Sequence, residues 1–237
     1  MKKSVLFIFL TVTVTLFSQN SGVAEYDFYY REFSDKPKNI NETNAREMVD
    51  VISEYAKSHK YLLKFNTNES LYYVETSMPT DGVNEFAYKF SKYIFSNGIF
   101  YQNKTTLEKI NETFEMNELY LVNDTLINNW ELSSEVKYIG KYKCYKATSK
   151  CSSCNENQLI TVWFAPEIPM AYGPAGYGGT PGLILEVTKY RYTLRLRKLK
   201  LSDKTIVIER PEKGIVITTE ELKSLMKKKR LEIMKGN

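Results

Sequence analysis

The side chains with the capacity for chemistry are few in this chain, and their order matches no catalytic motif. Glu167, Asp124 and Glu186 are candidate acid–base carboxylates, and Cys144 or a serine is the candidate nucleophile. Nucleophilic catalysis requires the nucleophile and its base to lie within hydrogen-bond reach. The sequence contains no Gly-x-Ser-x-Gly and no His-Glu-x-x-His. We therefore expect a protein that is not an enzyme, with a hydrolase as the less favoured alternative.

Metal and phosphate chemistry find equally little support. His59 is the only histidine, which excludes a metal site built from several histidines. It falls at the end of a predicted helix, where a polar or positive ring suits the helix dipole, and we prefer this interpretation to a catalytic role. The glycine-rich stretch precedes a strand, so it lacks the helix N-terminus that holds phosphate. We expect no metal and no cofactor.

The first eighteen residues resemble an export signal. Lys2 and Lys3 form a positive start, residues 5–16 are apolar apart from threonines, and Ser18 followed by Gln19 is a plausible cleavage site. The apolar run is too short to span a bilayer, which is typical of a secretory signal peptide. We expect residues 1–18 to be removed and residues 19–237 to form one domain, periplasmic or secreted.

Charge and composition limit the partners of that domain. Without Lys2 and Lys3 the formal net charge falls from +5 to +3, which gives no indication of nucleic-acid binding. Residues 227–230 form a basic run near the C-terminus. Such a run can contact anionic lipid head groups, or it can simply be the solvated end of a helix, and we prefer the second interpretation. No feature fixes the oligomeric state.

Three cysteines lie close together. Cys151 and Cys154 have the two-residue spacing of a redox motif, but they fall in a polar hairpin loop with no following helix to lower a thiolate pKa. In an exported protein a disulfide is expected, so a small structural Cys151–Cys154 bridge is the preferred interpretation. Cys144 lies on a predicted strand and is expected to be a buried thiol.

The most unusual stretch is residues 166–182. Nine of the chain's eighteen glycines and prolines fall within these seventeen residues, together with Tyr172 and Tyr177. A long loop without secondary structure is usually functional or disordered, and this much aromatic surface argues against disorder. Pro181 and Gly182 suit the centre of a type II turn, since Pro fixes φ and Gly supplies a positive φ.

The elements around this stretch are mostly strands. Strands are expected at 24–31, 61–65, 71–75, 92–96, 99–103, 107–115, 117–123, 130–138, 141–149, 158–165, 183–189, 192–201, 204–210 and 214–217. Asn97-Gly98 predicts a type I′ hairpin between residues 92–96 and 99–103. Helices are expected at 44–58, capped by Asn44, and from Thr218, with Glu221 completing a capping box.

Together these patterns predict a mainly β (α+β) protein of one domain. We expect a large, curved antiparallel sheet with two helices. Such a sheet buries one face and often curls around a helix or an apolar groove.

Three segments resemble a known family. Residues 179–184, Gly-Thr-Pro-Gly-Leu-Ile, are similar to the Gly-Leu-Pro-Gly-Leu-Ile signature of the GLPGLI proteins, which are secreted Bacteroidota proteins of largely unknown function. Residues 139–147 and 163–169 resemble two further family segments, and residues 172–174 match the next step. Thr180 departs from the signature leucine, and the loop with Cys151 and Cys154 looks like an addition. The family's layout resembles the half-barrel of periplasmic lipoprotein carriers, which is analogy only.

The function we expect is non-catalytic binding or carriage of an apolar ligand, such as a lipid, an acyl chain or an extended peptide, by a cell-envelope protein. The alternative is an interaction module that binds another envelope protein in an outer-membrane assembly. The expected binding residues, which supply contact area or fix the turn, are Trp163, Tyr172, Tyr177, Thr180, Pro181 and Gly182. An equally compatible interpretation is that the stretch only plugs one end of the sheet.

Overall fold

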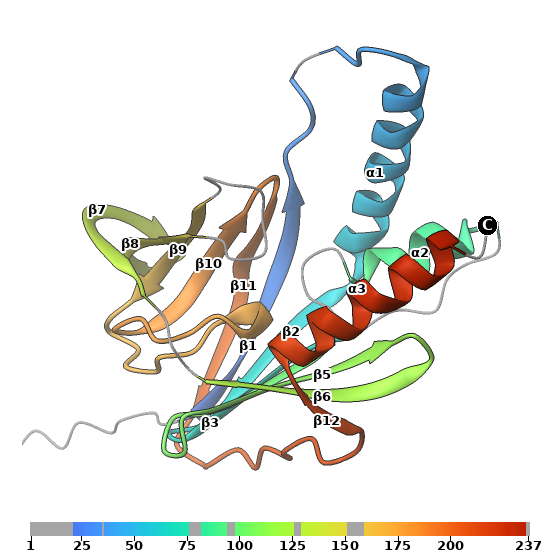
Figure 1. Cartoon of the computed structure of the whole chain (residues 1–237). Helices are drawn as coiled ribbons and strands as arrows, with labels where there is room; N and C mark the ends of the chain where they lie inside the picture. Colours follow the sequence, from blue (N-terminus) through green and yellow to red (C-terminus); the bar gives the residue numbers. More distant parts are fainter. Residues whose placement is uncertain are drawn as a thin grey trace, which may run out of the picture.

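The computed structural model describes residues 21–34, 36–75, 82–93, 98–125, 129–150 and 159–235. Its elements are one long sheet and a few helices (Figure 1). In chain order they are β1 (Ser21–Tyr30), α1 (Ile40–Ser58), β2 (Lys60–Phe65), β3 (Glu69–Glu75), α2 (Glu85–Ser91), β4 (Ile99–Asn103), β5 (Glu108–Glu115), β6 (Glu118–Thr125), β7 (Glu131–Ile139), β8 (Tyr142–Lys150), β9 (Leu159–Ala165), the 3₁₀ turn η1 (Pro174–Gly176), β10 (Leu183–Lys189), β11 (Tyr192–Ser202), β12 (Ile215–Thr218) and α3 (Thr219–Lys235).

All twelve strands belong to one open sheet, in the order β12-β6-β5-β4-β3-β2-β1-β11-β10-β9-β8-β7. Every neighbouring pair is antiparallel except β12 with β6, which is parallel. The terminal strands β12 and β7 do not pair with each other, so the curved sheet is not a closed barrel (Figure 1). This confirms the predicted mainly β, single-domain fold with a large curved sheet; three α-helices rather than two accompany it.

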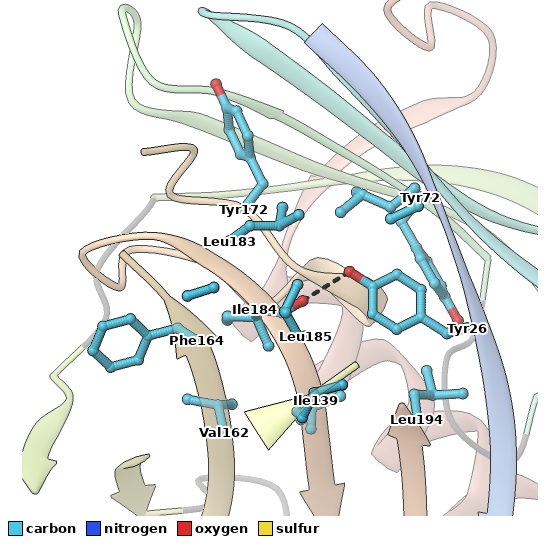
Figure 2. Close-up of a cluster of buried hydrophobic side chains, with 14 of the residues drawn as sticks. Tyr26, Tyr72, Ile139, Val162, Phe164, Tyr172, Leu183, Ile184, Leu185 and Leu194 are labelled. Atoms are coloured by element: carbon cyan, nitrogen blue, oxygen red, sulfur yellow. Dashed lines mark hydrogen bonds between the residues drawn. The ribbon is translucent and has the colours of Figure 1, made fainter. Parts of the chain in front are cut away.

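The central strand β1 shows why the chain folds as a sheet. Tyr26 and Phe28 are buried, whereas Asp27 between them and Glu25 before them are only half-buried and face the other side. This alternation places one face of the strand against the core. The Tyr26 hydroxyl donates a hydrogen bond of 2.8 Å to the carbonyl of Ile184, so the core also fixes the position of β10 (Figure 2).

The main core gathers buried side chains from strands that are consecutive in the sheet, β3, β2, β1, β11, β10, β9, β8 and β7. Figure 2 shows Tyr26 and Tyr72 on one side of it and Phe164, Ile184 and Val162 on the other. All of these side chains are almost fully buried. Burial of so many large apolar groups supplies the main stabilisation of the sheet.

The other face of the β4–β6 half is covered differently. Tyr101, Ile110 and Leu121 form a second cluster with Ile208. The predicted strand at 204–210 is wrong, because this segment crosses the sheet face without pairing in it. Its backbone is held by side chains instead, as in the 2.9 Å hydrogen bond from Asn66 Nδ2 to the carbonyl of Ile206.

Helix α1 begins earlier than predicted. Asn39, not Asn44, is the N-cap, and its side chain accepts a 2.9 Å hydrogen bond from the Glu42 amide. Most of the helix projects away from the sheet (Figure 1). Ile52, Ser53 and Ala56 are its buried residues, so only its C-terminal half packs as the predicted apolar stripe requires.

The hairpin predicted around Asn97-Gly98 is wrong, because β3 and β5 occupy the two sides of β4. Residues 94–97 themselves lie outside the described residues. Residues 85–91 form α2, capped by Asn84, and Lys92 and Tyr93 continue it as a turn rather than as a strand. Gly98 is required for another reason: a Cβ there would lie 1.9 Å from the carbonyl oxygen of Glu112 on β5. The glycine that suggested a tight turn is therefore explained by the close approach of its backbone to that of Glu112.

A buried histidine joins α1 to α2. His59 caps the C-terminus of α1, and its Nε2 lies 2.7 Å from Ser91 Oγ at the end of α2. Burial and the neighbouring charge of Lys92 lower the pKa of His59 to about 4. The ring is therefore neutral at physiological pH and packs edge-on against Tyr88. Of the two expected forms, a polar or a positive ring at the helix end, the structure favours the polar one.

Helix α3 follows the prediction closely. The Thr218 hydroxyl accepts a 3.2 Å hydrogen bond from the Glu221 amide, and the Glu221 carboxylate accepts one of 2.8 Å from the Thr218 amide. This is the predicted reciprocal capping box. No helix in the described part of the chain is both long and apolar enough to cross a membrane.

Candidate functional site

Residues 166–182, here called the arm, follow a defined path between β9 and β10. Backbone hydrogen bonds tie the arm to itself and to β10, including 2.8 Å from the Gly179 amide to the Ala171 carbonyl and 2.9 Å from the Ile184 amide to the Tyr172 carbonyl. Its turn η1 packs against β2, β3 and β4. β9 and β4 are far apart in the sheet order. A segment as short as the arm can contact both strands only if it crosses the concave side of the curved sheet.

The glycines of the arm let its backbone approach other groups closely. A Cβ on Gly176, which has φ of +72°, would lie 2.4 Å from the Phe100 ring. A Cβ on Gly173 would lie 2.7 Å from the Ile184 side chain, and one on Gly178 would lie 2.7 Å from the Ala171 carbonyl oxygen. The arm therefore fills the inside of the sheet as a close-packed layer.

The turn at Pro181 is tighter than the predicted type II turn. The Gly182 amide donates a 2.8 Å hydrogen bond to the Thr180 carbonyl, which closes a three-residue turn. The Leu183 amide, which a type II turn would direct to Thr180, donates instead to Ile168. Gly182 has φ of +151°, and a Cβ there would lie 2.2 Å from the carbonyl oxygen of Ala165.

The six predicted binding residues differ in accessibility. Tyr172, Thr180 and Gly182 are buried, with Tyr172 only 1% exposed. Trp163 and Tyr177 are half-buried, and Pro181 is exposed. Burial raises the pKa of the Tyr177 hydroxyl to about 12. The arm thus presents little of its aromatic surface to a ligand.

Two polar atoms are left without partners beneath the arm. The Tyr172 hydroxyl and Gln102 Oε1 are buried and accept or donate no hydrogen bond within the described residues. Gln102 does donate through Nε2 to the Gly176 carbonyl at 2.6 Å. The Trp130 indole likewise donates to the Gly178 carbonyl at 2.8 Å. Side chains from β4 and from residue 130 therefore fix the arm from two sides.

The candidate catalytic residues do not assemble into a reactive group. Cys144 is fully buried, as predicted, and burial raises the pKa of its thiol to about 11, so no thiolate nucleophile forms near neutral pH. Both carboxylate oxygens of Glu186 are paired with basic side chains. Asp124 lies on β6, where Thr219 donates to it at 3.4 Å, and Glu167 is exposed at the start of the arm. Cys151 and Cys154 lie outside the described residues, so their disulfide stays a prediction.

An open apolar surface lies elsewhere, between α2, β5 and α3. Two hollows of about 330 and 540 Å³ meet at Glu115 on β5. We call them together the α2–β5–α3 groove. Its lining consists of Phe90, Tyr93, Phe114, Glu115, Leu222, Lys223, Met226, Lys227 and Arg230.

The groove combines exposed apolar side chains with uncompensated positive charge. Phe114 is 56% exposed and Phe90 is 51% exposed, and the Phe90 ring stacks on that of Phe86. The lining contains three basic side chains and one carboxylate. Lys223, Lys227 and Arg230 form no ion pair with any described residue. Such a surface can hold an apolar group together with an anion.

Sequence reasoning missed the groove, although one signal was present. On β5 the usual alternation is inverted, because the polar Thr113 is buried and the aromatic Phe114 beside it faces solvent. The basic run of α3 was noticed, but only the fold brings it beside an aromatic from β5. Helix α3 is separated from both α2 and β5 by more than one hundred residues, so no local pattern contains the groove.

Comparisons with known proteins identify the arm region and the fold. The model of a family described as "Protein of unknown function (Porph_ging)" matches residues 150–186, which include β9 and the arm. No curated protein matches the chain.

Solved structures of PNGF-II, determined in two space groups, are similar in fold. Their TM-scores are 0.54 and 0.55, at 14% and 15% sequence identity, over 87% of this chain. The chain spans about a third of the length of PNGF-II, since 32% and 33% of that protein are covered. At this identity the likeness describes the sheet architecture alone.

Proposed function

We propose that this protein binds the acyl chain of an anionic amphiphile in the α2–β5–α3 groove and performs no catalysis. The single observation that carries the proposal is the combination of exposed aromatic rings with three basic side chains that pair with no described carboxylate. The apolar side chains favour binding of the ligand's acyl chain, and the basic side chains favour binding of its anionic head group. When a ligand covers an apolar surface that faces solvent in the free protein, the free energy of the complex is lowered.

We further propose that the chain is a GLPGLI-like protein exported to the periplasm or secreted. Residues 179–184, which resemble the GLPGLI signature, and residues 163–169, which resemble a further segment of that family, fall within the stretch matched by the family model. The predicted signal peptide at 1–18 supports export. In a cell envelope, anionic lipids and fatty acids are the amphiphiles that such a groove meets, and α3 is then the point of peripheral membrane contact.

A fluorescent palmitate probe tests the ligand. Titration into the purified protein is expected to give saturable binding, and the double variant Lys227→Glu/Arg230→Glu is expected to weaken it at least about tenfold, because each basic side chain near an anionic head contributes roughly 1 kcal/mol. The matched control is Lys228→Glu/Lys229→Glu, which changes the same charge on the same helix outside the groove lining. Equal weakening by both double variants, or absence of saturation, would contradict the proposal.

A second candidate function is an interaction module for another envelope protein. The edge strand β7 carries exposed Leu132, Val136 and Tyr138, and its outer side, which pairs with no described strand, can accept a strand from a partner. A register shift between Leu132 and Val136 interrupts this edge, which limits the length of strand that can add. A photocrosslinker at position 138 would give adducts with one defined envelope protein, and Val136→Pro would remove them.

A further inference from the structure

A separate polar pocket lies on the β7–β11 half of the sheet, away from the elements that form the groove. It has a volume of about 360 Å³. Lys137, Tyr138, Ile139, Gly140, Glu186, Arg195 and Leu196 line it. In the sheet register, Glu186 on β10 stands between Trp163 on β9 and Arg195 on β11, so these three side chains share one face.

The floor of the pocket is a buried, charge-compensated carboxylate. Glu186 is 4% exposed, and its Oε1 accepts a 2.6 Å hydrogen bond from Lys137 Nζ. Its Oε2 accepts a 2.5 Å hydrogen bond from Arg195 Nε. A buried carboxylate persists as an anion only when it is paired in this way. Two cations and one anion leave the pocket with one surplus positive charge.

The two cations are fixed in place and retain free donors. The Arg195 guanidinium lies 5.1 Å from the centre of the Tyr29 ring, and within the described residues only its Nε has a hydrogen-bond acceptor. Lys137 Nζ lies 4.3 Å above the Trp163 ring, and its side chain is 30% exposed. Both are therefore preorganised, and the two Nη groups of Arg195 remain available for an anion.

We propose that this pocket binds a small organic monocarboxylate of about the size of a hexuronic acid. The free edge of Arg195 matches the two oxygens of a carboxylate, and Lys137 supplies a second donor. One surplus charge is neutralised by a monoanion, whereas a dianion such as phosphate would add uncompensated negative charge beside Glu186. The pocket volume lies near the small end of ligand sites, which suits a single sugar-sized acid rather than an acyl chain.

The test is a calorimetric titration of the purified full chain with glucuronate, with glucose as the neutral probe of the same size. Saturable binding of glucuronate without binding of glucose is expected. Arg195→Lys is expected to weaken glucuronate binding at least about tenfold, because lysine lacks the planar fork. The matched control Arg197→Lys, two residues along the same strand and 61% exposed, is expected to leave the affinity within about twofold.

A second variant leaves the Glu186 ion pairs intact. Gly140 lines the pocket with φ of +58°, and a Cβ there would meet no atom within 4 Å. Asparagine tolerates this backbone conformation, so Gly140→Asn is expected to fold and to weaken glucuronate binding at least about fivefold by occupying space. Unchanged affinity in this variant would overturn the proposal, as would glucose binding, equal weakening by Arg197→Lys, or phosphate binding as tight as that of glucuronate.

This inference is independent of the acyl-chain proposal. Lys227→Glu/Arg230→Glu is expected to leave glucuronate affinity unchanged, because neither residue lines this pocket. Loss of glucuronate binding in that variant would contradict the assignment to the Glu186 pocket.

Discussion

The arm and the α2–β5–α3 groove are opposites in sequence and in exposure. The arm gathers half of the chain's glycines and prolines with two tyrosines into seventeen residues, yet most of it is buried. The groove is assembled from three separate elements with ordinary composition, yet it exposes Phe90 and Phe114. Dense glycine and proline here indicate a backbone that packs closely against other groups. The open surface that we propose for binding arises where apolar side chains face solvent next to basic side chains that pair with no described carboxylate.

The largest expected effect tests whether the arm is core. Gly182→Ala places a Cβ 2.2 Å from the Ala165 carbonyl oxygen at a φ of +151°. We expect the free energy of unfolding to fall by about 3 kcal/mol or more. Urea denaturation measures it. Gly140→Ala is the matched control, because its φ is also positive but no atom lies within 4 Å of a Cβ, and only about 1 kcal/mol is expected.

The next prediction concerns the pH dependence of stability, which should differ between α2, on the groove side, and the arm. Folding lowers the pKa of His59 from 6.5 to about 4, so the unfolded chain binds the proton more tightly. The stability that the neutral ring contributes is therefore complete above pH 6.5 and is lost as the pH falls towards 4, by on the order of 2 kcal/mol. Because His59 holds α2, hydrogen exchange should increase in α2 and not in the arm. In His59→Gln, hydrogen exchange in α2 should depend less on pH. An equal increase of exchange in α2 and in the arm at low pH would contradict the prediction.

A smaller effect is expected at the residue that departs from the GLPGLI signature. Thr180 is 2% exposed, and its hydroxyl donates a 2.8 Å hydrogen bond to the Gly182 carbonyl. Thr180→Val keeps the shape and removes this bond, so thermal unfolding should report a loss of about 1 kcal/mol. The half-buried Thr161→Val serves as the control, because the Thr161 hydroxyl forms no side-chain hydrogen bond within the described residues, and the expected change is below about 0.5 kcal/mol. No difference between the two variants would show that the turn does not depend on the hydroxyl.

The smallest effect on stability is expected in the groove. Phe114→Ser removes a side chain that is 56% exposed, so unfolding should change by no more than about 0.5 kcal/mol. Binding of the palmitate probe should nevertheless weaken several-fold. A large loss of stability would place Phe114 in the core and would remove the contrast between the two regions.

Much of the fold could be predicted from local patterns. The limits of β10 were predicted to the residue, and the capping box of Thr218 and Glu221 was confirmed. Both are short-range features, decided by alternation and by hydrogen bonds within four residues. The errors share a different cause. Gly98 and Gly182 are required by contacts with Glu112 and with Ala165, which are distant in sequence, so turn chemistry alone gave the wrong turns.

The candidate site was less accessible to sequence reasoning. The basic run of α3 was visible, but its aromatic neighbours Phe90 and Phe114 come from elements that only the sheet order brings together. The Glu186 pocket likewise depends on the approach of Lys137 from the edge strand β7. Charge pairs between distant strands leave no periodic trace in a sequence.

Photoaffinity labelling with a diazirine-bearing palmitate, followed by peptide mapping, compares the two regions directly. The account predicts adducts on α2, β5 and α3, and their loss in Lys227→Glu/Arg230→Glu. Adducts concentrated on residues 163–182, with none on α3, would contradict it and would return the binding site to the arm.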